Sequence, residues 1–316
     1  MRRLRSRWTV PPLLAALALC AYAWTVAMPE IGRPVQLPPP PADKLWSFGF
    51  VGDTQLGEGI VDVVFGRFEK AGVEFVLHLG DIVDDASSSD QWKYVLDEAR
   101  RHQIRLRPVV GNHDRLIGTS DRGETRFREF FPDLPDTFYR FSHRGLTFVM
   151  LNSERSLLPW TEQGRFLAST LDDLSDTTVV CLHRPVFTCG RRDLANQLLR
   201  RVWLHARLVE TPVRLVLAGH HHYYDRTKPL DGITYVVSGG GSHKLYPAAE
   251  PNEATATFRA GFNHYGLVDV YADRLDVRVL DVDDGELDRF TISRVGTAPD
   301  GPPAPVLSAT TAAGRR

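Results

Sequence analysis

Five apolar segments of this sequence each end in a cluster of polar side chains, and this repeated arrangement limits the possible folds more than any other feature. The clusters are Gly52-Asp53-Thr54-Gln55, Gly80-Asp81-Ile82-Val83-Asp84, Gly111-Asn112-His113-Asp114, Leu182-His183-Arg184-Pro185 and Gly219-His220-His221-His222. The preceding segments, residues 46–51, 75–79, 104–110, 177–181 and 213–218, have the length and composition of buried strands. Open α/β sheets bind ligands at the carboxyl ends of their strands. We therefore expect oxygen and imidazole donors to meet at one edge of a sheet, where they would form a metal site.

The spacing of the first three clusters supports this prediction. Asp53 and Asp81 are 28 residues apart, and Asp81 and Asn112 are 31 residues apart, which is about one strand–helix–strand unit in each case. Successive parallel strands would bring these side chains next to one another. In the last cluster, His221 alternates with its neighbours, so we expect it to point away from the face shared by its two neighbouring histidines. Four further histidines are expected to be structural or exposed: His78, His102, His143 and His205.

Four helices are predicted between the strands. Residues 58–71 have one apolar face, and Gly72 follows where a helix C-cap is expected. Asp90 and Thr161 are expected to be the N-caps of two further helices. The fourth helix is predicted over residues 193–209. Its apolar side chains, which we expect to face inward, are Leu194, Leu198, Leu199 and Val202.

Two pairs of segments have the pattern of antiparallel strands. Residues 138–142 are expected to pair with 146–151, and residues 265–271 with 275–280. Together with the alternating strands and helices, this order predicts a mixed α/β domain with two sheets. The sequence has no internal repeat.

The N-terminus carries a targeting signal. Residues 9–28 are uncharged and follow a cluster of arginines, and their length is about that needed to cross a hydrocarbon core. The positive-inside rule then predicts that the rest of the chain is extracytoplasmic. Two outcomes stay open: residues 1–28 remain as one membrane-anchoring helix, or they are a signal peptide cleaved near Ala23 and the protein is secreted.

The composition of the remaining chain separates a folded unit from its flanks. Residues 29–43 are rich in proline and are expected to form a semi-rigid linker. Residues 296–316 have few large apolar side chains and are expected to be disordered. The folded unit is therefore predicted over residues 44–295.

The charge and the cysteines exclude some classes of function. The formal net charge is −1, which gives no reason to expect a nucleic acid polymer as partner. The sequence has three cysteines, too few for a disulfide framework. Cys181 and Cys189 lie close to the predicted site, and whether they pair in an exported protein stays open. A thiol or serine hydrolase is disfavoured, because Cys189 and Ser242 have no evident base beside them.

The polar clusters, taken together and in order, resemble the calcineurin-like metallophosphoesterase superfamily. The matching motifs are GD-x-Q, GD-x-x-D, GNHD, a strand-following His and GH-x-H, and the resemblance covers nearly all of residues 44–295. It includes residues 139–152, the helix around 160–174 and the Gly239-Gly240-Gly241 segment. The resemblance implies a four-layered α/β/β/α sandwich, with two mixed sheets flanked by helices, and a site for two metal ions.

The same resemblance implies roles for the residues that match the motifs. The first metal would be bound by Asp53, Gln55, Asp81 and His222, and the second by Asp81, Asn112, His183 and His220. His113 would act as general acid toward the leaving group, and Asp84 would hydrogen-bond His113 and set its tautomer. Arg184, beside His183, would contact a phosphate oxygen of the substrate.

These residue types suit the chemistry that the resemblance implies. Two metal ions ~3.5–4 Å apart would bind the phosphoryl oxygens and lower the pKa of a water. Carboxylate and amide oxygens mixed with imidazoles favour Mn, Fe or Zn as the divalent or trivalent ions. Gln55 stands where many relatives carry a histidine, so the first metal is expected to be held more weakly. Asp84 stands where purple acid phosphatases carry a metal-binding tyrosine, which disfavours a purple tyrosinate–iron enzyme.

The resemblance predicts hydrolysis of a phosphomonoester, a phosphodiester or a nucleotide as small-molecule substrate. The alternative is a non-catalytic metal-binding scaffold of the same fold. The natural substrate, the metal identity and the oligomeric state stay open. Substrate specificity is expected to come from loops over the metal site, namely residues 84–90, 118–134, 187–193 and 244–260.

Overall fold

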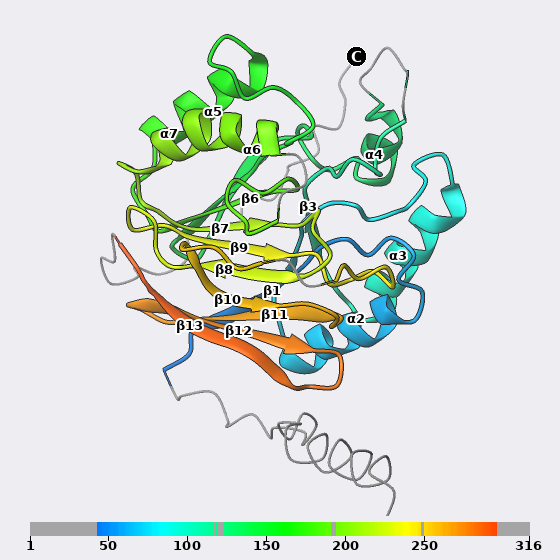
Figure 1. Cartoon of the computed structure of the whole chain (residues 1–316). Helices are drawn as coiled ribbons and strands as arrows, with labels where there is room; N and C mark the ends of the chain where they lie inside the picture. The colour runs from blue at the N-terminus through cyan, green and yellow to red at the C-terminus, as the bar shows by residue number, and fades with distance from the viewer. Residues whose placement is uncertain (1–42, 117, 119–122, 191–193, 248–249, 296–316) are drawn as a thin grey trace, which may run out of the picture.

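Two β-sheets lie face to face between layers of helices in the computed structural model (Figure 1). The structure describes residues 43–116, 118, 123–190, 194–247 and 250–295. The predicted membrane segment, nearly all of the proline-rich linker and the C-terminal tail lie outside these residues. Among the helices of the described residues, none is both long enough and apolar enough to span a membrane.

The first sheet has six strands, in the order β13-β12-β11-β1-β2-β3. Their bounds are β1 Trp46–Val51, β2 Val76–His78, β3 Leu106–Pro108, β11 His264–Val270, β12 Arg274–Asp281 and β13 Glu286–Ser293. β1, β2 and β3 are parallel, and β1 pairs with β11 in the antiparallel sense. The three parallel strands therefore end at the same edge of the sheet.

The second sheet has seven strands, in the order β10-β8-β9-β7-β6-β5-β4. Their bounds are β4 Tyr139–His143, β5 Leu146–Met150, β6 Thr178–Leu182, β7 Val213–Ala218, β8 Tyr224–Thr227, β9 Thr234–Ser238 and β10 Thr255–Arg259. β5, β6, β7 and β9 are parallel to one another. The two antiparallel pairs expected from the sequence are present as β4–β5 and β11–β12.

Helices cover the outer faces of both sheets. Their bounds are α2 Ile60–Ala71, α3 Ser89–Arg101, α4 Thr125–Phe130, α5 Glu162–Asp172, α6 Leu194–Arg200 and α7 Ala206–Leu208, with a π-helical turn η1 at Arg201–His205 between the last two. α2 and α3 pack on the first sheet, and α5 and the α6–α7 segment pack on the second. The four layers agree with the predicted α/β/β/α sandwich.

The helix caps follow the sequence with one exception. Gly72 adopts the left-handed conformation at the C-terminus of α2 (φ +66°), and the Thr161 hydroxyl accepts the Gly164 N–H at the start of α5, both as expected. The predicted N-cap Asp90 is wrong. Ser88 caps α3 instead, because its side chain accepts the Gln91 N–H, and Asp90 lies in the first turn, where its charge favours the helix dipole.

The space between the sheets is filled by aromatic and branched side chains. Phe48, Phe75 and Phe148 form edge-to-face and stacked pairs with ring centroids 5.3–5.7 Å apart, and they belong to a larger buried cluster from both sheets. Burying each such side chain contributes about 1.5–3 kcal/mol to the free energy of unfolding. This packing holds the two sheets, and therefore their strand ends, in fixed positions.

The predicted orientation of the fourth helix is wrong. Leu198, Leu199 and Val202 are 50%, 56% and 65% exposed. The buried side chains of this segment lie on another face and include Leu204 and Leu208. This second apolar stripe packs against the second sheet, so the helix turns the predicted stripe to its outer surface. Leu194 belongs to the described backbone, but its side chain lies outside the described residues.

Candidate metal centre

The predicted donors come from the strand ends of two sheets, not from one. Asp53, Asp81 and Asn112 follow β1, β2 and β3 of the first sheet. His183 and His220 follow β6 and β7 of the second sheet. The expectation of a single sheet edge is therefore corrected: two parallel sets of strands end side by side.

Hydrogen bonds join the two sets of strand ends. His183 Nδ1 lies 2.9 Å from the Leu79 carbonyl oxygen, and the His220 N–H donates to the Asp53 carboxylate at 2.9 Å. The Gly241 N–H donates to the Gly52 carbonyl at 3.0 Å. These bonds fix the relative position of the donors from the two sheets. We call the seven predicted donors together the metal edge: Asp53, Gln55, Asp81, Asn112, His183, His220 and His222.

The backbone of the metal edge adopts an uncommon conformation. Asp53, Asp81 and His220 have φ values of +59°, +53° and +68°, in the left-handed region that non-glycine residues rarely occupy. Such conformations persist where the surroundings fix them, and they concentrate at functional sites. Gly111 supplies part of these surroundings, because a Cβ there would lie 2.1 Å from the Asp81 nitrogen. The glycine of the GNHD motif is therefore needed for the close approach of two strand ends.

The aspartates of the first sheet present buried oxygens. The side chains of Asp53 and Asp81 are 0% and 2% exposed. One oxygen of Asp81 accepts the His113 N–H at 2.8 Å, and the other lies 3.2 Å from His183 Nε2. Asn112 Oδ1 lies 3.2 Å from the same imidazole nitrogen. Asp81 thus occupies a central position among the predicted donors.

Gln55 provides the clearest test of whether a metal fits here. It is 5% exposed, and its Oε1 has no hydrogen-bond partner among the residues that the structure describes. A buried amide oxygen without a partner costs free energy. A cation at this position would satisfy it, so the residue present fits a metal.

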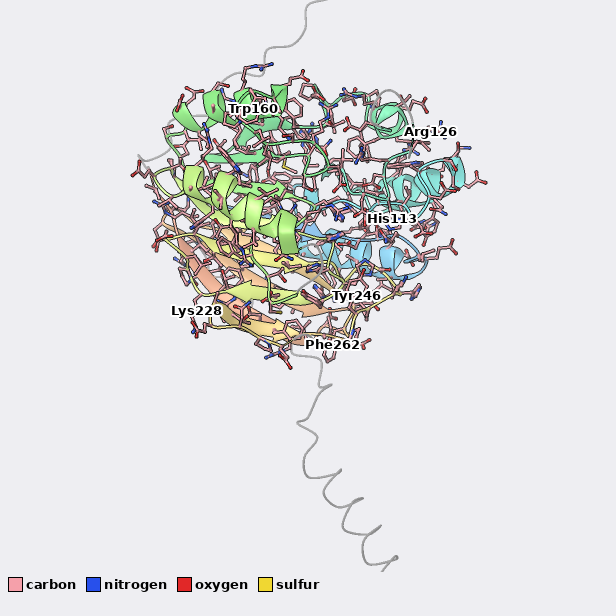
Figure 2. All side chains as sticks on the ribbon, turned by 45° about the horizontal axis from the view of Figure 1, so that its top comes forward. His113, Arg126, Trp160, Lys228, Tyr246 and Phe262 are labelled. Carbon is pink, nitrogen blue, oxygen red and sulfur yellow. The ribbon has the colours of Figure 1, made fainter. Side chains whose placement is uncertain are left out.

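Hydrogen bonds to backbone carbonyls, on the side away from the other donors, orient His183 and His222. His222 Nδ1 is bonded to the Lys244 carbonyl, and its Nε2 lies 3.4 Å from Asp53 Oδ1. Its ring stacks on Tyr246 with centroids 4.4 Å apart. His220 differs from His183 and His222, because its Nδ1 faces another predicted donor and lies 3.2 Å from His183 Nε2. Such outer bonds are typical of metal-binding histidines, because they fix the tautomer and the ring plane. Figure 2 labels Tyr246 and His113, which lie on the same side of the molecule.

The electrostatics of the metal edge favour a cation. Burial lowers the pKa of His183, but the charge and hydrogen bond of Asp81 raise it more, so that it reaches about 10. Burial raises the pKa of Asp53, partly offset by the hydrogen bond to His222. Burial also raises the pKa of Asp81, but the charge of His183 and the bonds it receives outweigh this, and its pKa is lowered. Ligand atoms of Asp81, His183 and His220 lie within 4.8 Å of one another. Paired carboxylates that hold a proton on a neighbouring imidazole provide the negative potential that a metal ion requires.

His113 is placed beside the metal edge, but its partner differs from the prediction. Its Nδ1 lies 2.8 Å from the main-chain carbonyl oxygen of Asp84, whereas the Asp84 carboxylate is 3.5 Å away. The longer distance exceeds that of an ordinary hydrogen bond. The backbone carbonyl therefore sets the tautomer of His113, and the carboxylate contributes charge.

Arg184 lies at the border of the metal edge. Its Nη1 is 3.1 Å from His220 Nε2, and its Nε donates to Glu154 at 2.5 Å. The Arg184 N–H donates to the Ser153 hydroxyl at 2.9 Å. The guanidinium is thus held next to a predicted ligand, and its contact with a phosphate oxygen stays a prediction.

Asp114 is a positioning residue to which the sequence argument gave no role. It is fully buried, and its carboxylate accepts the N–H groups of Ile82 and Gly111 at 2.8 Å and of Val83 at 3.2 Å. Burial and the charge of Asp81 raise its pKa to about 7. It ties the ends of β2 and β3 together and so positions their donors. The sequence feature that could have indicated this role is the position of Asp114 as the last residue of the GNHD motif.

Other candidate residues lie away from the centre. His221 points away, as expected, and its Nδ1 lies 2.8 Å from the Tyr223 hydroxyl. Cys181 and Cys189 are both free and buried, so they form no disulfide with each other. Lys244 and Tyr246 of the predicted specificity loop 244–260 reach the metal edge through His222.

A second group of possible ligands lies between α2 and α3. It contains Asp62, Glu98 and His102. His102 lies 2.8 Å from Asp62 through Nε2 and 2.8 Å from Glu69 through Nδ1. Because both ring nitrogens already have carboxylate partners, this group is an ordinary ion-pair cluster, in keeping with the structural role expected for His102.

Comparison with known proteins agrees with the geometry. The sequence profile of the calcineurin-like phosphoesterases matches residues 47–224, more than half of the chain. This chain belongs to the calcineurin-like phosphoesterase family. The match includes every residue of the metal edge, as well as His113 and Arg184.

Relatives and solved structures cover most of this chain. The phosphoenolpyruvate phosphatase of onion (Allium cepa) is 22% identical over 278 residues, which cover 80% of this chain and 56% of that protein. Purple acid phosphatase PPD1 of yellow lupin (Lupinus luteus) has a TM-score of 0.67 at 19% identity, over 84% of this chain and 57% of that chain. A dimetal phosphatase from Danio rerio has a TM-score of 0.50 at 16% identity, over 79% of this chain and 99% of that chain.

The similarity to the first two of these proteins covers only part of their length. This chain spans little more than half the length of the onion and lupin proteins, and the two solved structures show a shared fold.

Proposed function

We propose that this chain is a dinuclear metal-dependent phosphoesterase that hydrolyses a small phosphomonoester, phosphodiester or nucleotide. The observation that carries the proposal is the convergence of buried carboxylate, amide and imidazole donors from two sheets, with the unpartnered Gln55 oxygen among them. The likeness to a protein described as a dimetal phosphatase supports it.

We infer that the donors would form two sets that share one residue. Asp53, Gln55 and His222 would hold one metal ion. Asn112, His183 and His220 would hold the other, with Asp81 as ligand to both. When bound, the two ions would neutralise phosphoryl charge and supply a water of lowered pKa. The mixture of oxygen and imidazole donors favours Mn, Fe or Zn.

The protein's own groups would bind the ester and move a proton. Arg184 carries a planar guanidinium that suits a phosphate oxygen. His113 would donate a proton to the leaving oxygen from Nε2, because its Nδ1 is engaged by the Asp84 carbonyl. The Asp84 carboxylate, 3.5 Å away, would stabilise the charged imidazole before transfer.

Metal reconstitution tests the proposal. The full chain is stripped of metal and reloaded separately with Mn, Zn, Fe, Ni and Mg, and turnover of p-nitrophenyl phosphate is compared with that of bis-p-nitrophenyl phosphate. We expect metal-dependent turnover of one ester, and the preferred ester then distinguishes a monoesterase from a diesterase. Two bound ions without turnover of these esters or of a panel of nucleotides and phospholipids would support the scaffold alternative instead.

We also propose that the folded unit works outside the cytoplasm. The support is the uncharged segment 9–28 behind a cluster of arginines. Fractionation of cells that express the full chain, followed by N-terminal sequencing of the product, distinguishes an anchored protein from one cleaved near Ala23. A cytoplasmic product with an intact N-terminus would contradict the proposal.

A further inference from the structure

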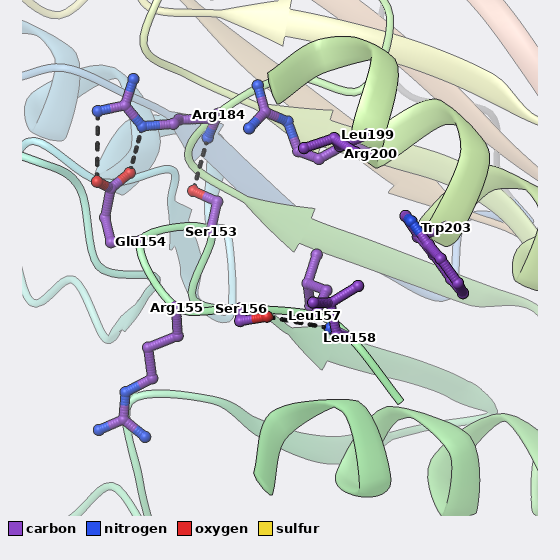
Figure 3. A pocket seen from close by; sticks show the side chains of 10 residues that line it. All are labelled: Ser153, Glu154, Arg155, Ser156, Leu157, Leu158, Arg184, Leu199, Arg200 and Trp203. Carbon is purple, nitrogen blue, oxygen red and sulfur yellow. Dashed lines mark hydrogen bonds and ion pairs between the residues drawn. The ribbon is translucent and has the colours of Figure 1, made fainter. Parts of the chain in front are cut away.

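A cavity of about 490 Å³ adjoins the metal edge on the side of the second sheet (Figure 3). It lies between the segment that joins β5 to α5 and the helical segment α6–η1. Its lining residues are Ser153, Glu154, Arg155, Ser156, Leu157, Leu158, Arg184, Leu199, Arg200 and Trp203. Among the residues that the structure describes, none of the predicted specificity loops contributes to the lining. The size is within the range of small-molecule sites.

One end of the cavity is charged and meets the metal edge. Arg184 donates to Glu154 and lies 3.1 Å from His220 Nε2, so it belongs to both sites. Arg115 also donates to Glu154, at 3.4 Å. Two guanidinium groups contact one carboxylate at this end. Because Arg184 borders both sites, a phosphoryl group held at the metal edge would place its organic substituent at the entrance of this cavity.

The other end of the cavity is apolar. Leu157 and Leu158 come from one wall and Leu199 and Trp203 from the other, and Figure 3 shows Trp203 on the far side from Arg184. Leu199 and Trp203 are 56% and 38% exposed. Leu199 and Trp203 thus lie on the outer surface of this helical segment and are only partly covered by the rest of the protein.

Polar side chains in the walls are occupied by the protein itself. Arg155 points away from the cavity in Figure 3, and its guanidinium donates to the buried Glu124. The Ser156 hydroxyl accepts the Leu158 N–H at 3.3 Å, and Arg200 donates to the Pro185 carbonyl at 3.0 Å. A ligand rich in hydroxyl groups would lose water contacts along the leucine wall without replacing them.

We propose that this cavity binds the organic group of the phosphoester, and that this group is apolar and of about the size of an aromatic ring system. The phosphoryl end would lie toward Arg184 and the hydrocarbon between the leucines and Trp203. The inference rests on the proposed function and narrows its substrate class. Sugar phosphates and glycerol phosphates are then poor substrates.

Binding of phosphonates that cannot be hydrolysed tests the inference without turnover. The metal-loaded full chain is titrated calorimetrically with 1-naphthylmethylphosphonate, methylphosphonate and 2,3-dihydroxypropylphosphonate. We expect the naphthyl compound to bind at least about 10-fold more tightly than the other two, because it would fill an apolar pocket that they leave empty. Equal affinities, or no measurable binding of the naphthyl compound, would overturn the inference.

Neighbouring residues of the same helix provide matched controls. Leu199→Ser and Trp203→Ala are expected to weaken naphthyl binding about 3- to 10-fold and to leave methylphosphonate binding unchanged. Leu198→Ser and Val202→Ala change side chains of similar exposure that do not line the cavity, and they should leave both affinities unchanged. Equal losses in all variants would show a general effect on the helix and refute the cavity as the binding site.

Kinetics separates this inference from the proposed function. If the wild-type chain hydrolyses 1-naphthyl phosphate, Leu199→Ser should raise KM and leave kcat unchanged. Absence of hydrolysis with every metal would refute the proposed reaction, while the phosphonate titrations would still support or refute the cavity. Hydrolysis with a lower KM for glycerol 3-phosphate than for 1-naphthyl phosphate would keep the reaction and refute the cavity.

Discussion

The metal edge and the adjoining cavity lie side by side but are built in different ways. The metal edge consists of buried strand ends, and backbone hydrogen bonds fix donors such as Asp81 and His183 on all sides. One wall of the cavity presents partly exposed apolar side chains, Leu199 and Trp203, from one helical segment. The first depends on backbone geometry, whereas the second depends on side-chain surface. On the two proposals made above, substrate preference would be free to change while the reacting centre stays constant.

The largest effect is expected at the metal edge. Asp81→Ala removes the residue that we propose as ligand to both metal ions and leaves His183 without its carboxylate partner. We expect kcat to fall by on the order of 10³-fold or more for every substrate, measured by steady-state kinetics on aryl and alkyl esters. As a control, Asp90→Ala removes an exposed carboxylate of α3 and should leave kcat unchanged. A loss restricted to one substrate would break the distinction between the two regions.

The next effect is expected at His113. His113→Asn should lower kcat about 10²- to 10⁴-fold for an alkyl phosphate, because the leaving alkoxide needs a proton. The loss should be much smaller for p-nitrophenyl phosphate, whose leaving group departs as a stable anion. Equal losses on both esters would show that His113 is not the general acid.

Gln55 tests how strongly each half of the metal edge holds its ion. Gln55→Ala should weaken one metal about 10- to 100-fold, measured as metal retained after dialysis. Gln55→His should strengthen it, because an imidazole is a better donor for Mn, Fe or Zn than a neutral amide. Gln103→Ala, at an exposed position, serves as control. Unchanged retention in Gln55→Ala would remove Gln55 from the ligand set.

The smallest effect is expected at the ion-pair cluster between the helices, which should change stability alone. Hydrogen bonds to Glu69 and Asp62 raise the pKa of His102 above its usual value of 6.5. Their extra stabilisation is fully present below pH 6.5 and is lost as the pH rises through the folded-state pKa. His102→Gln should therefore lower the melting temperature more at pH 5.5 than at pH 9. The corresponding loss in the free energy of unfolding should be at most about 1 kcal/mol. An equal decrease at both pH values would contradict the pKa shift, and altered kcat would contradict a purely structural role.

The sequence predicted which side chains converge at the metal edge because its signals are local. Glycine followed by a polar residue at the end of an apolar strand specifies both the turn and the donor, and the spacing of Asp53, Asp81 and Asn112 specifies parallel neighbours. The division of the donors between two sheets was not predicted, because it is not a local property of the sequence. Which strands share a sheet depends on packing across the whole domain.

The misplaced residues show where local patterns lose their value. Leu199 belongs to one of two apolar stripes on its helix, and only contacts of Leu204 and Leu208 with the second sheet decide which stripe is buried. Asp84 was expected to contact His113 through its carboxylate. The loop geometry presents its carbonyl instead, since the Gln91 side chain accepts the Asp84 N–H at 2.9 Å and fixes the turn.

The carboxylate of Asp114 has a consequence for the dynamics of the metal edge. One side chain accepts the amide protons of Ile82, Val83 and Gly111, which lie on two separate strand ends. These amides cannot lose their partner one at a time through motion of that side chain. Their hydrogen–deuterium exchange should therefore proceed as one cooperative opening, with a common opening free energy, and the two strand ends would fluctuate together as a single unit.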